Sequence, residues 1–425
     1  MTHHMLSSDQ NIIEDVRAKF AHVDTCPFQG ERIFFENAGG ALTLKSVVDT
    51  SAKFAAIPDN QGRDNPASYA LVDIIERAKV KARLFFNANS GQFFVGESGT
   101  ELIFRIVCAA IMASETGGQV LGSTLEHPAT RSACEKWAKA AGKPHVLIKH
   151  DNETGSVDAQ AYAREVTEDT RVATILHTSP VSGMGVDVAA ISKAIRSVAP
   201  NCFIIVDGIQ HAAHGGLDID AYDIDAYIVS PYKMFSRHGY GLAWISDRLS
   251  ALDHNSLVGG PKENWELGTR DTGAYATFAD VVEYYEWLGS KFTDDNNPRA
   301  KIMAASKAIK SHETDLTNAM IKGIGNQKGL ADMPEVTVLC GIDNPLREGL
   351  VAMNIEGMDA LELVEALNKR GIRTHARKAD HYSGNILTPL GLSSCVRVSM
   401  CHYNTEHEVS TFLSAIDEII EGMKI

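Results

Sequence analysis

Three residues of this chain carry side chains that together suit covalent chemistry on a ring-containing aldehyde. Lys233 follows one short apolar run, Asp207 follows another and His127 follows a third. A lysine amine forms a Schiff base with an aldehyde, a buried carboxylate holds a proton on a pyridinium nitrogen, and an imidazole stacks on a ring. Each residue alone has a simpler explanation, as a surface lysine, a helix cap or a loop histidine. Their combination predicts that they serve one cofactor.

A loop rich in glycine and hydroxyl groups adds a place for a phosphate. Ser98-Gly99-Thr100-Glu101 follows the apolar run at residues 93–95, and its serine and glutamate have the spacing of a capping box that begins a helix. The free N–H groups of a helix N-terminus bind phosphate well. Gln210 and Ser230 follow the same apolar runs as Asp207 and Lys233. The whole set predicts pyridoxal 5′-phosphate (PLP) as the cofactor.

Short apolar runs alternate with helical segments in the central part of the chain. Such runs are typical of strands buried on both faces of a mostly parallel sheet. The predicted strands lie at residues 92–95, 119–121, 145–148, 172–176, 202–206, 226–229 and 241–245. Predicted helices at residues 100–113, 128–141 and 188–198 separate several of them. The pattern predicts an α/β doubly wound domain, in which ligands bind beyond the carboxyl ends of the strands.

The C-terminal third has a pattern typical of a smaller α+β domain. A long helix is predicted at residues 298–322, strand-like segments follow, and Thr405 and Glu408 form a second capping box. We therefore predict an N-terminal segment, residues 1–30, that packs with the small domain. Residues 31–293 would form the large PLP-binding α/β domain, and residues 294–425 the small α+β domain.

Composition narrows the possible partners and the cellular compartment. The 425 residues carry a net charge of −14, so a nucleic-acid partner is not expected. The seven cysteines are an odd number without C-x-x-C pairs, which indicates neither a disulfide framework nor a structural zinc site. The apolar stretch at residues 102–113 is too short to span a membrane, and residues 1–10 lack a signal-peptide core. We expect a cytoplasmic protein with no membrane partner.

The chain resembles the class V aminotransferases, a group of fold-type I PLP enzymes that contains cysteine desulfurases, kynureninase and isopenicillin N epimerase-like proteins. The similarity runs from about Phe34 to Thr405. Its landmarks are Phe35-Glu36-Asn37-Ala38-Gly39-Gly40, Ser98-Gly99-Thr100-Glu101, Glu126-His127, Val206-Asp207-Gly208-Ile209-Gln210, Ser230-Pro231-Tyr232-Lys233, Glu266-Leu267-Gly268-Thr269, Arg397-Val398-Ser399 and Tyr403-Asn404-Thr405. The first and fifth of these resemble the cysteine desulfurase-like branch most.

The resemblance implies a fold-type I architecture and a role for each matching residue. Lys233 would form the Schiff base, Asp207 would bind the pyridine nitrogen and His127 would stack on the ring, as the catalytic set. The other cofactor contacts implied are Ser98, Gly99, Thr100, Gln210, Ser230 and Thr269, with Thr269 reaching in from the second subunit of a homodimer. The substrate, an α-amino acid, would be bound by Arg397, Asn37 and Arg63, with Arg397 holding the α-carboxylate.

Two departures from the family pattern bear on the reaction. Relatives commonly carry an asparagine where this chain has Pro180. Desulfurases carry a sulfur-accepting cysteine on a mobile loop at the segment His381-Tyr382-Ser383-Gly384-Asn385, and this chain has no cysteine between Cys340 and Cys395. We therefore expect β-elimination by a desulfurase-like lyase that lacks the persulfide cysteine. Aminotransfer and epimerisation at Cα are the alternatives.

A metal-dependent hydrolase is a hypothesis of a different functional class. His211 and His214 have helical metal-ligand spacing close to Asp207, which a metal-dependent hydrolase could use. That hypothesis leaves Lys233 and Arg397 without a role, so no metal is expected. A dinucleotide-binding enzyme is disfavoured, because no G-x-G-x-x-G follows the first strand of the α/β region. A non-catalytic PLP-binding protein is disfavoured because both Lys233 and Arg397 are present.

Overall fold

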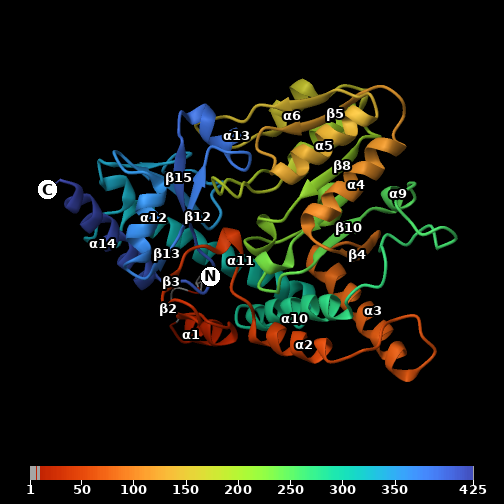
Figure 1. The fold of residues 1–425 in the computed structure, drawn as a ribbon, viewed down its shortest axis with the longest axis horizontal. Helices are drawn as coiled ribbons and strands as arrows, with labels where there is room; N and C mark the ends of the chain where they lie inside the picture. The colour runs from red at the N-terminus through yellow and green to blue at the C-terminus, as the bar shows by residue number, and fades with distance from the viewer. Residues whose placement is uncertain (1–5, 7–9, 425) are drawn as a thin grey trace.

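The computed structural model describes residue 6 and residues 10–424, and it contains a large and a small sheet joined by a long helix (Figure 1). The large sheet lies at the right of the view and the small C-terminal sheet at the left. The long helix is α11 (Pro298–Lys322), whose N-cap is the side chain of Asn297. Ile302 and Ile309 of α11 pack into the core of the large sheet, and Leu316 packs into the core of the small one.

The described residues form a seven-stranded large sheet. In sheet order its strands are β4 (Gln92–Gly96), β10 (Gly241–Ile245), β9 (Ala226–Val229), β8 (Phe203–Asp207), β7 (Thr170–Leu176), β5 (Gln119–Ser123) and β6 (His145–Ile148). β10 runs antiparallel to both of its neighbours, and the pairs from β9 to β6 are parallel. The predicted α/β architecture with a mostly parallel sheet is therefore confirmed.

Helices cover both faces of the large sheet, which explains why the central parts of its strands are mostly apolar. In β4, Phe94 packs on one face with α4 and α5, whereas Phe93 and Val95 pack on the other. The first face is covered by α4 (Gly99–Ala113) and α5 (Pro128–Ala140). The second face is covered by α3 (Pro66–Phe86), α6 (Ala159–Glu165), α7 (Val188–Val198) and α10 (Thr272–Gly289).

Short elements connect these layers and precede them. They are α1 (Gln10–Lys19), β1 (Thr25–Cys26), β2 (Gly30–Glu31), β3 (Ile33–Phe34), η2 (Asn37–Gly39), α2 (Lys45–Ala55), η3 (His211–Ala213), α8 (Ile219–Tyr222), η4 (Pro231–Lys233) and α9 (Asp247–Ser250). The predicted start of α4 is confirmed, because the Ser98 hydroxyl accepts a hydrogen bond from the Glu101 N–H at 3.1 Å.

The small domain is built on a four-stranded antiparallel sheet. In sheet order its strands are β11 (Val336–Val338), β12 (Leu350–Ile355), β15 (Ser394–Ser399) and β14 (His375–Lys378). The other elements of this part are η5 (Leu330–Asp332), α12 (Ala360–Asn368), β13 (Ile372–Arg373), α13 (Gly384–Leu387), η6 (Thr388–Leu390) and α14 (Glu406–Met423). The predicted capping box at the start of α14 is confirmed, because Thr405 and Glu408 bond each other's backbone N–H.

Two segments cross the predicted domain division. Residues 31–35 were assigned to the large domain, yet β3 pairs in parallel with β13, and Phe35 is buried in the core of the small sheet. The segment 1–30 was predicted to pack with the small domain, and its described part contacts both domains. The ring of Phe20 lies 5.5 Å from that of Phe235 and 4.6 Å from that of Tyr403. Residues 1–5 and 7–9 of that segment lie outside the described residues.

Among the described residues, no helix is both long enough and apolar enough to cross a bilayer.

Candidate active site

Lys233 lies just beyond the carboxyl end of β9, at the end of η4. Its Nζ donates a hydrogen bond to Oε1 of Gln210 at 3.1 Å. Burial and the nearby Arg397 guanidinium lower the pKa of Lys233 to about 7. A large fraction of the amine is therefore uncharged near neutral pH, which suits both attack on an aldehyde and proton transfer.

Asp207 ends β8, next to β9, and its side chain is buried. One carboxylate oxygen accepts from the hydroxyl of Thr130 at 3.2 Å, and the other accepts from the N–H of Ile209 at 3.1 Å. Burial raises the pKa of Asp207, and the hydrogen bond from Ile209 and the charge of Lys233 oppose that rise. A buried carboxylate held in this way is suited to bind a cationic N–H group of a ligand ring.

His127 caps α5, and the adjacent Glu126 is buried beside Asp207. The Nδ1 of His127 accepts from the N–H of Ala129 at 3.2 Å, and burial with the Lys233 charge lowers its pKa to about 4. The imidazole is therefore neutral. Burial and the charge of Asp207 raise the pKa of Glu126 to about 8. Burial thus favours the neutral acid form of Glu126 at neutral pH, whereas the Ile209 hydrogen bond and the Lys233 charge favour the ionised form of Asp207.

The N-terminus of α4 faces the hydroxyl of Ser230. Any side chain at position 99 would fill the space between them. A Cβ on Gly99 would lie 2.5 Å from Oγ of Ser230, and a Cβ on Gly241 would lie 2.6 Å from the N of Gly99. Thr100 is exposed in the first turn of α4. The cradle leaves backbone N–H groups and a hydroxyl available, which fits a phosphate group.

Arg397 lies on β15 of the small domain and is 1% exposed. Its Nη1 donates to the carbonyl oxygen of Pro180 at 2.7 Å, and its Nε has no hydrogen-bond partner among the described residues. Burial, followed by the charge of Arg377, lowers the pKa of Arg397 to about 9. Pro180, at the position where relatives carry an asparagine, thus contacts Arg397 through its backbone carbonyl. The remaining donors of Arg397 are available to bind a carboxylate.

Asn37 is buried, and its amide is engaged by the protein itself. Its Nδ2 donates to the carbonyl oxygen of Ser399 at 2.7 Å, and its Oδ1 accepts from the Tyr403 hydroxyl. The following Gly40 packs on the ring of Tyr232, since a Cβ there would lie 3.3 Å from that ring. The structure therefore gives Asn37 a part in holding the glycine loop against the site.

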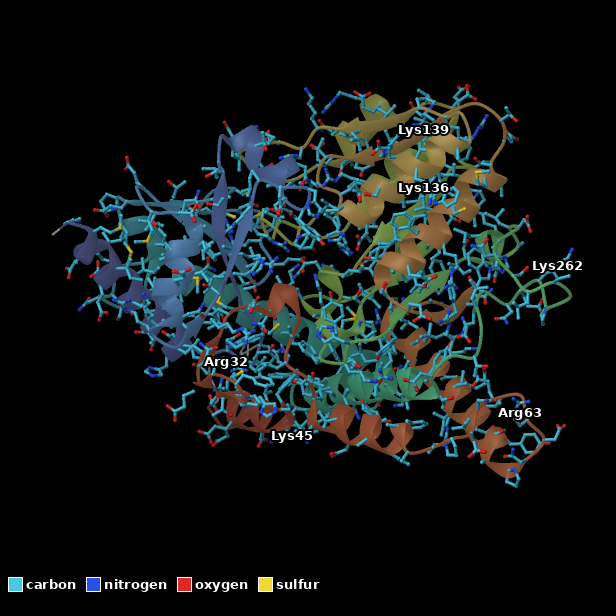
Figure 2. All side chains as sticks on the ribbon, viewed as in Figure 1. Arg32, Lys45, Arg63, Lys136, Lys139 and Lys262 are labelled. Atoms are coloured by element: carbon cyan, nitrogen blue, oxygen red, sulfur yellow. The ribbon has the colours of Figure 1, made fainter. Side chains whose placement is uncertain are left out.

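Thr269 and Arg63 are not brought to Lys233 within the single chain. Both are exposed. Figure 2 shows Arg63 on the loop before α3, at the edge of the molecule far from the small domain. Thr269 lines a hollow of about 310 Å³ on that side together with Asn60 and Thr272. A role for either residue at the site depends on a second subunit, as the sequence resemblance implies.

Arg377 is a site residue that the sequence interpretation missed. It lies on β14, where it stands opposite Cys395 while His375 stands opposite Arg397. Alternate residues of a strand share a face, so Arg377 and Arg397 project from the same side of the sheet. The charge of Arg377 contributes to the lowered pKa values of Lys233 and His127. Its only sequence signal is the alternation of His375-Ala376-Arg377, because the strand has no apolar run.

The segment that carries the sulfur-accepting cysteine in desulfurases is docked over the site in this chain. Arg131 donates to the carbonyl oxygen of His381 at 3.1 Å, and Asn385 donates to the carbonyl oxygen of Thr124 at 2.6 Å. The ring of Tyr382 lies 6.4 Å from that of His127. The segment therefore closes the side of the site next to His127.

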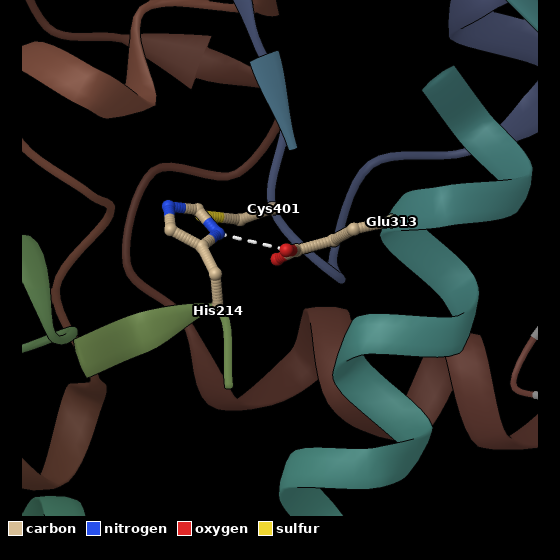
Figure 3. Close-up of side chains that lie close together, drawn as sticks. All are labelled: His214, Glu313 and Cys401. Carbon is tan, nitrogen blue, oxygen red and sulfur yellow. Dashed lines mark hydrogen bonds and ion pairs between the residues drawn. The ribbon is translucent and has the colours of Figure 1, made fainter. Parts of the chain in front are cut away.

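The two histidines with metal-ligand spacing do not converge on one position. Nδ1 of His211 lies 2.8 Å from Glu348, and Nδ1 of His214 lies 2.7 Å from Glu313. Ligand atoms of His214, Glu313 and Cys401 lie within 4.8 Å of one another, and Figure 3 shows the imidazole bound to the carboxylate. This group of three contains His214 but not His211, so the described residues do not bring the two histidines to one metal position.

A large cavity of about 1200 Å³ lies elsewhere, between α1, α11 and α14. Arg17, His312 and Thr405 line it, and Lys233, Asp207 and Arg397 do not. Cavity size alone therefore does not identify the candidate active site. The polar groups that converge at the edge of the large sheet identify it.

The fold and the site together define a fold-type I PLP-binding architecture. The residues present fit the cofactor, because the Gly99 cradle, the Lys233 amine and the Asp207 carboxylate match its phosphate, aldehyde and ring nitrogen. The class-V aminotransferase family profile matches residues 33–412, and the chain belongs to this family. It is thus an enzyme of a PLP-dependent family.

Relatives cover nearly the whole chain. The aminotransferase-like protein FGM3 of Gibberella zeae is 26% identical, over 98% of this chain and 100% of its own. The cysteine desulfurase of Escherichia coli is 24% identical, over 91% of this chain and 93% of its own. The solved structure of the cysteine desulfurase from Thermococcus onnurineus superposes with a TM-score of 0.82 at 20% identity, covering 96% of this chain and 98% of that one. This last similarity establishes the fold alone.

Proposed function

We propose that the protein binds PLP through Lys233 and acts on an α-amino acid by removing the proton from Cα. The observation that carries the proposal is the position of the Lys233 amine, 3.1 Å from Gln210 and close enough to Asp207 and Arg397 to feel both charges. Burial and the Arg397 charge lower its pKa to about 7, and the Asp207 charge opposes that change. The site thus brings together a nucleophile, the residue proposed to bind the ring nitrogen and the arginine proposed to bind the carboxylate.

The residues of the chain divide the work among them. When bound, PLP supplies an electron sink for the electrons left at Cα. Arg397 binds the α-carboxylate and so orients the Cα–H bond, while the free amine of Lys233 takes the Cα proton. Asp207 would hold the proton of the ring nitrogen, because the hydrogen bond from Ile209 and the charge of Lys233 favour its carboxylate form. His127, as a neutral imidazole, would lie against the bound cofactor and help to exclude water.

Among the outcomes open after Cα deprotonation, we favour β-elimination without protein persulfide transfer. Residues 341–394 contain no cysteine. The segment that would carry one is fixed by the hydrogen bonds of His381 and Asn385. Aminotransfer and epimerisation at Cα remain the alternatives within the family.

We further propose a homodimer in which Thr269 and Arg63 of one copy complete the site of the other. Both side chains are exposed, and neither contributes to the site around Lys233 in its own chain. All seven cysteines are free thiols, which supports a reducing compartment such as the cytoplasm.

The deciding experiment adds PLP to the purified protein and follows the yellow absorbance. Wild type and Lys369→Ala, which alters an exposed lysine, should both become yellow. Lys233→Ala should stay colourless, and borohydride should fix the cofactor to wild type and Lys369→Ala but not to Lys233→Ala. A colourless wild type refutes the proposal. Absorbance that disappears with a metal chelator would instead support the metal hydrolase hypothesis.

A panel of amino acids then separates the reaction types. Each is assayed for 2-oxo acid, ammonia and sulfide, with and without an added oxo-acid acceptor. Elimination releases ammonia and needs no acceptor. Turnover that requires the acceptor would establish aminotransfer, and loss of optical activity without product would establish epimerisation.

A further inference from the structure

The same face of the small sheet presents two guanidinium groups to the site. Arg377 and Arg397 stand diagonally across the β14–β15 pair, where Cα atoms on one face are about 7–8 Å apart. The Arg377 charge contributes to the lowered pKa values of Lys233, His127 and Arg397, and it opposes the rise that burial causes in the pKa of Tyr232, so it lies among these groups. The two arginines therefore face the same small volume beside the lysine amine.

Arg377 has no acceptor of its own among the described residues. No hydrogen bond or ion pair is formed by its guanidinium there, and its Nε is buried without a partner. The two acidic side chains nearest to it are occupied. Glu36 binds Arg373 at 2.9 Å and His375 at 3.3 Å, and Asp380 accepts from the N–H of Tyr382 at 2.8 Å. A half-buried guanidinium without an acceptor is costly unless a ligand supplies one.

The charged groups of PLP and of an amino acid with an uncharged side chain would all be bound by residues other than Arg377. The phosphate is matched by the α4 N-terminus and Ser230, the ring nitrogen by Asp207, and the α-carboxylate by Arg397. What remains to face Arg377 is the side chain of the substrate. A second anionic group one or two carbons beyond Cα would supply the acceptor that the second arginine lacks.

We infer that Arg377 selects substrates with an acidic side chain, a carboxylate or a sulfinate carried on Cβ or Cγ. The inference rests on the proposed function, and it adds a substrate class to it. Arg397 grips the α-carboxylate and Arg377 grips the side-chain anion, so the amino acid is held at two points across Cα.

The test measures binding to the PLP-loaded protein by titration calorimetry and by the change in cofactor absorbance. L-Aspartate and L-cysteine sulfinate supply the two kinds of anion, and L-asparagine supplies a neutral side chain of the same shape. Wild type should bind at least one of the two acids about 10-fold or more tighter than asparagine. Arg377→Gln should weaken binding of that acid by about 10- to 100-fold and leave asparagine within about threefold.

A matched control changes the neighbouring charge on the opposite face of the same strand. Lys378→Gln removes one positive charge from an exposed position and should bind all three amino acids as wild type does. If Arg377→Gln is not folded by circular dichroism, Arg377→Lys is used, and it should lose part of the preference for the acid while keeping affinity for asparagine.

Two results would overturn the inference without touching the proposed function. One is a wild type that takes up PLP and binds asparagine as tightly as both acids. The other is an equal loss of affinity for acid and amide in Arg377→Gln, which would assign that arginine to the α-carboxylate. A wild type that takes up no PLP refutes the proposed function and the inference together.

Discussion

The side-chain amide of Gln210 joins Lys233 to a buried histidine. Oε1 of Gln210 accepts from the lysine amine at 3.1 Å, and its Nε2 lies 3.4 Å from Nε2 of His214. His214 in turn is bound to Glu313 at 2.7 Å. Burial lowers the pKa of His214, yet the carboxylate of Glu313 and that of Glu348 outweigh it, and the pKa is raised overall. When Nδ1 of His214 donates to Glu313, its Nε2 accepts from the Gln210 amide, which keeps Oε1 of Gln210 turned toward the lysine.

Capture of added PLP should follow the ionisation of Lys233. Because its pKa is lowered to about 7, the free amine forms above that pH. The capture rate should therefore rise with a midpoint near neutral pH instead of near the usual lysine pKa of about 10.4. Arg397→Gln removes a neighbouring cation, so it should move the midpoint to higher pH. Stopped-flow absorbance measures the rate, and Arg370→Gln, at an exposed arginine, should leave the midpoint in place.

Gly99→Ala should weaken PLP binding. The added methyl group would lie 2.5 Å from the Ser230 hydroxyl, in the space that a phosphate needs. We expect at least about a 10-fold higher dissociation constant by absorbance titration, which corresponds to about 1.4 kcal/mol. Gly422→Ala is the matched control, because a Cβ there meets no atom within 4 Å. Equal affinity of both variants would place the phosphate elsewhere.

Asp207→Asn should reduce turnover by at least about 100-fold while Lys233 still captures PLP. A neutral amide cannot hold a cationic ring nitrogen as a carboxylate does, although it keeps the shape of the side chain. The assay compares turnover with the yield of yellow protein. Asp253→Asn, at an exposed position, should behave as wild type. Full activity in Asp207→Asn would show that this aspartate has only a structural role.

Glu313→Ala should destabilise the fold by about 1–3 kcal/mol, because it leaves the buried imidazole of His214 without its hydrogen-bond partner. Urea denaturation followed by circular dichroism measures the change. Asp343→Ala breaks the exposed ion pair with Lys322 and should give no resolvable change. An equally small change in both variants would mean that the buried pair does not stabilise the fold.

Sequence alone was sufficient for the large sheet and for the residues at its carboxyl edge. A strand buried on both faces, such as β9, is apolar throughout, and the predicted run at residues 226–229 coincides with it. The predicted run at residues 145–148 coincides with β6, the edge strand, which is only partly buried. Parallel strands bring the residues after them together, which places Lys233 beside Gln210.

Contacts between distant segments could not be predicted in the same way. β14 has one face toward polar site groups, so it has no apolar run, and Arg377 was missed with it. The hydrogen bond from the Asn37 amide to the carbonyl of Ser399, 362 residues further along the chain, was also not predicted. Local pattern carries no information on such a pairing. The packing of the whole chain decides it.

The position of Phe35 has a consequence for how the chain folds. This residue comes from the start of the chain, yet it fills the core of the small sheet and lies with its ring 6.0 Å from that of Phe412. The adjacent β3 pairs with β13, which is also in the last sixth of the sequence. During synthesis the N-terminal strand has no partner until nearly all of the protein has left the ribosome. The small domain can therefore close its core only as one of the last steps of folding, and the C-terminal third expressed by itself would lack an interior side chain.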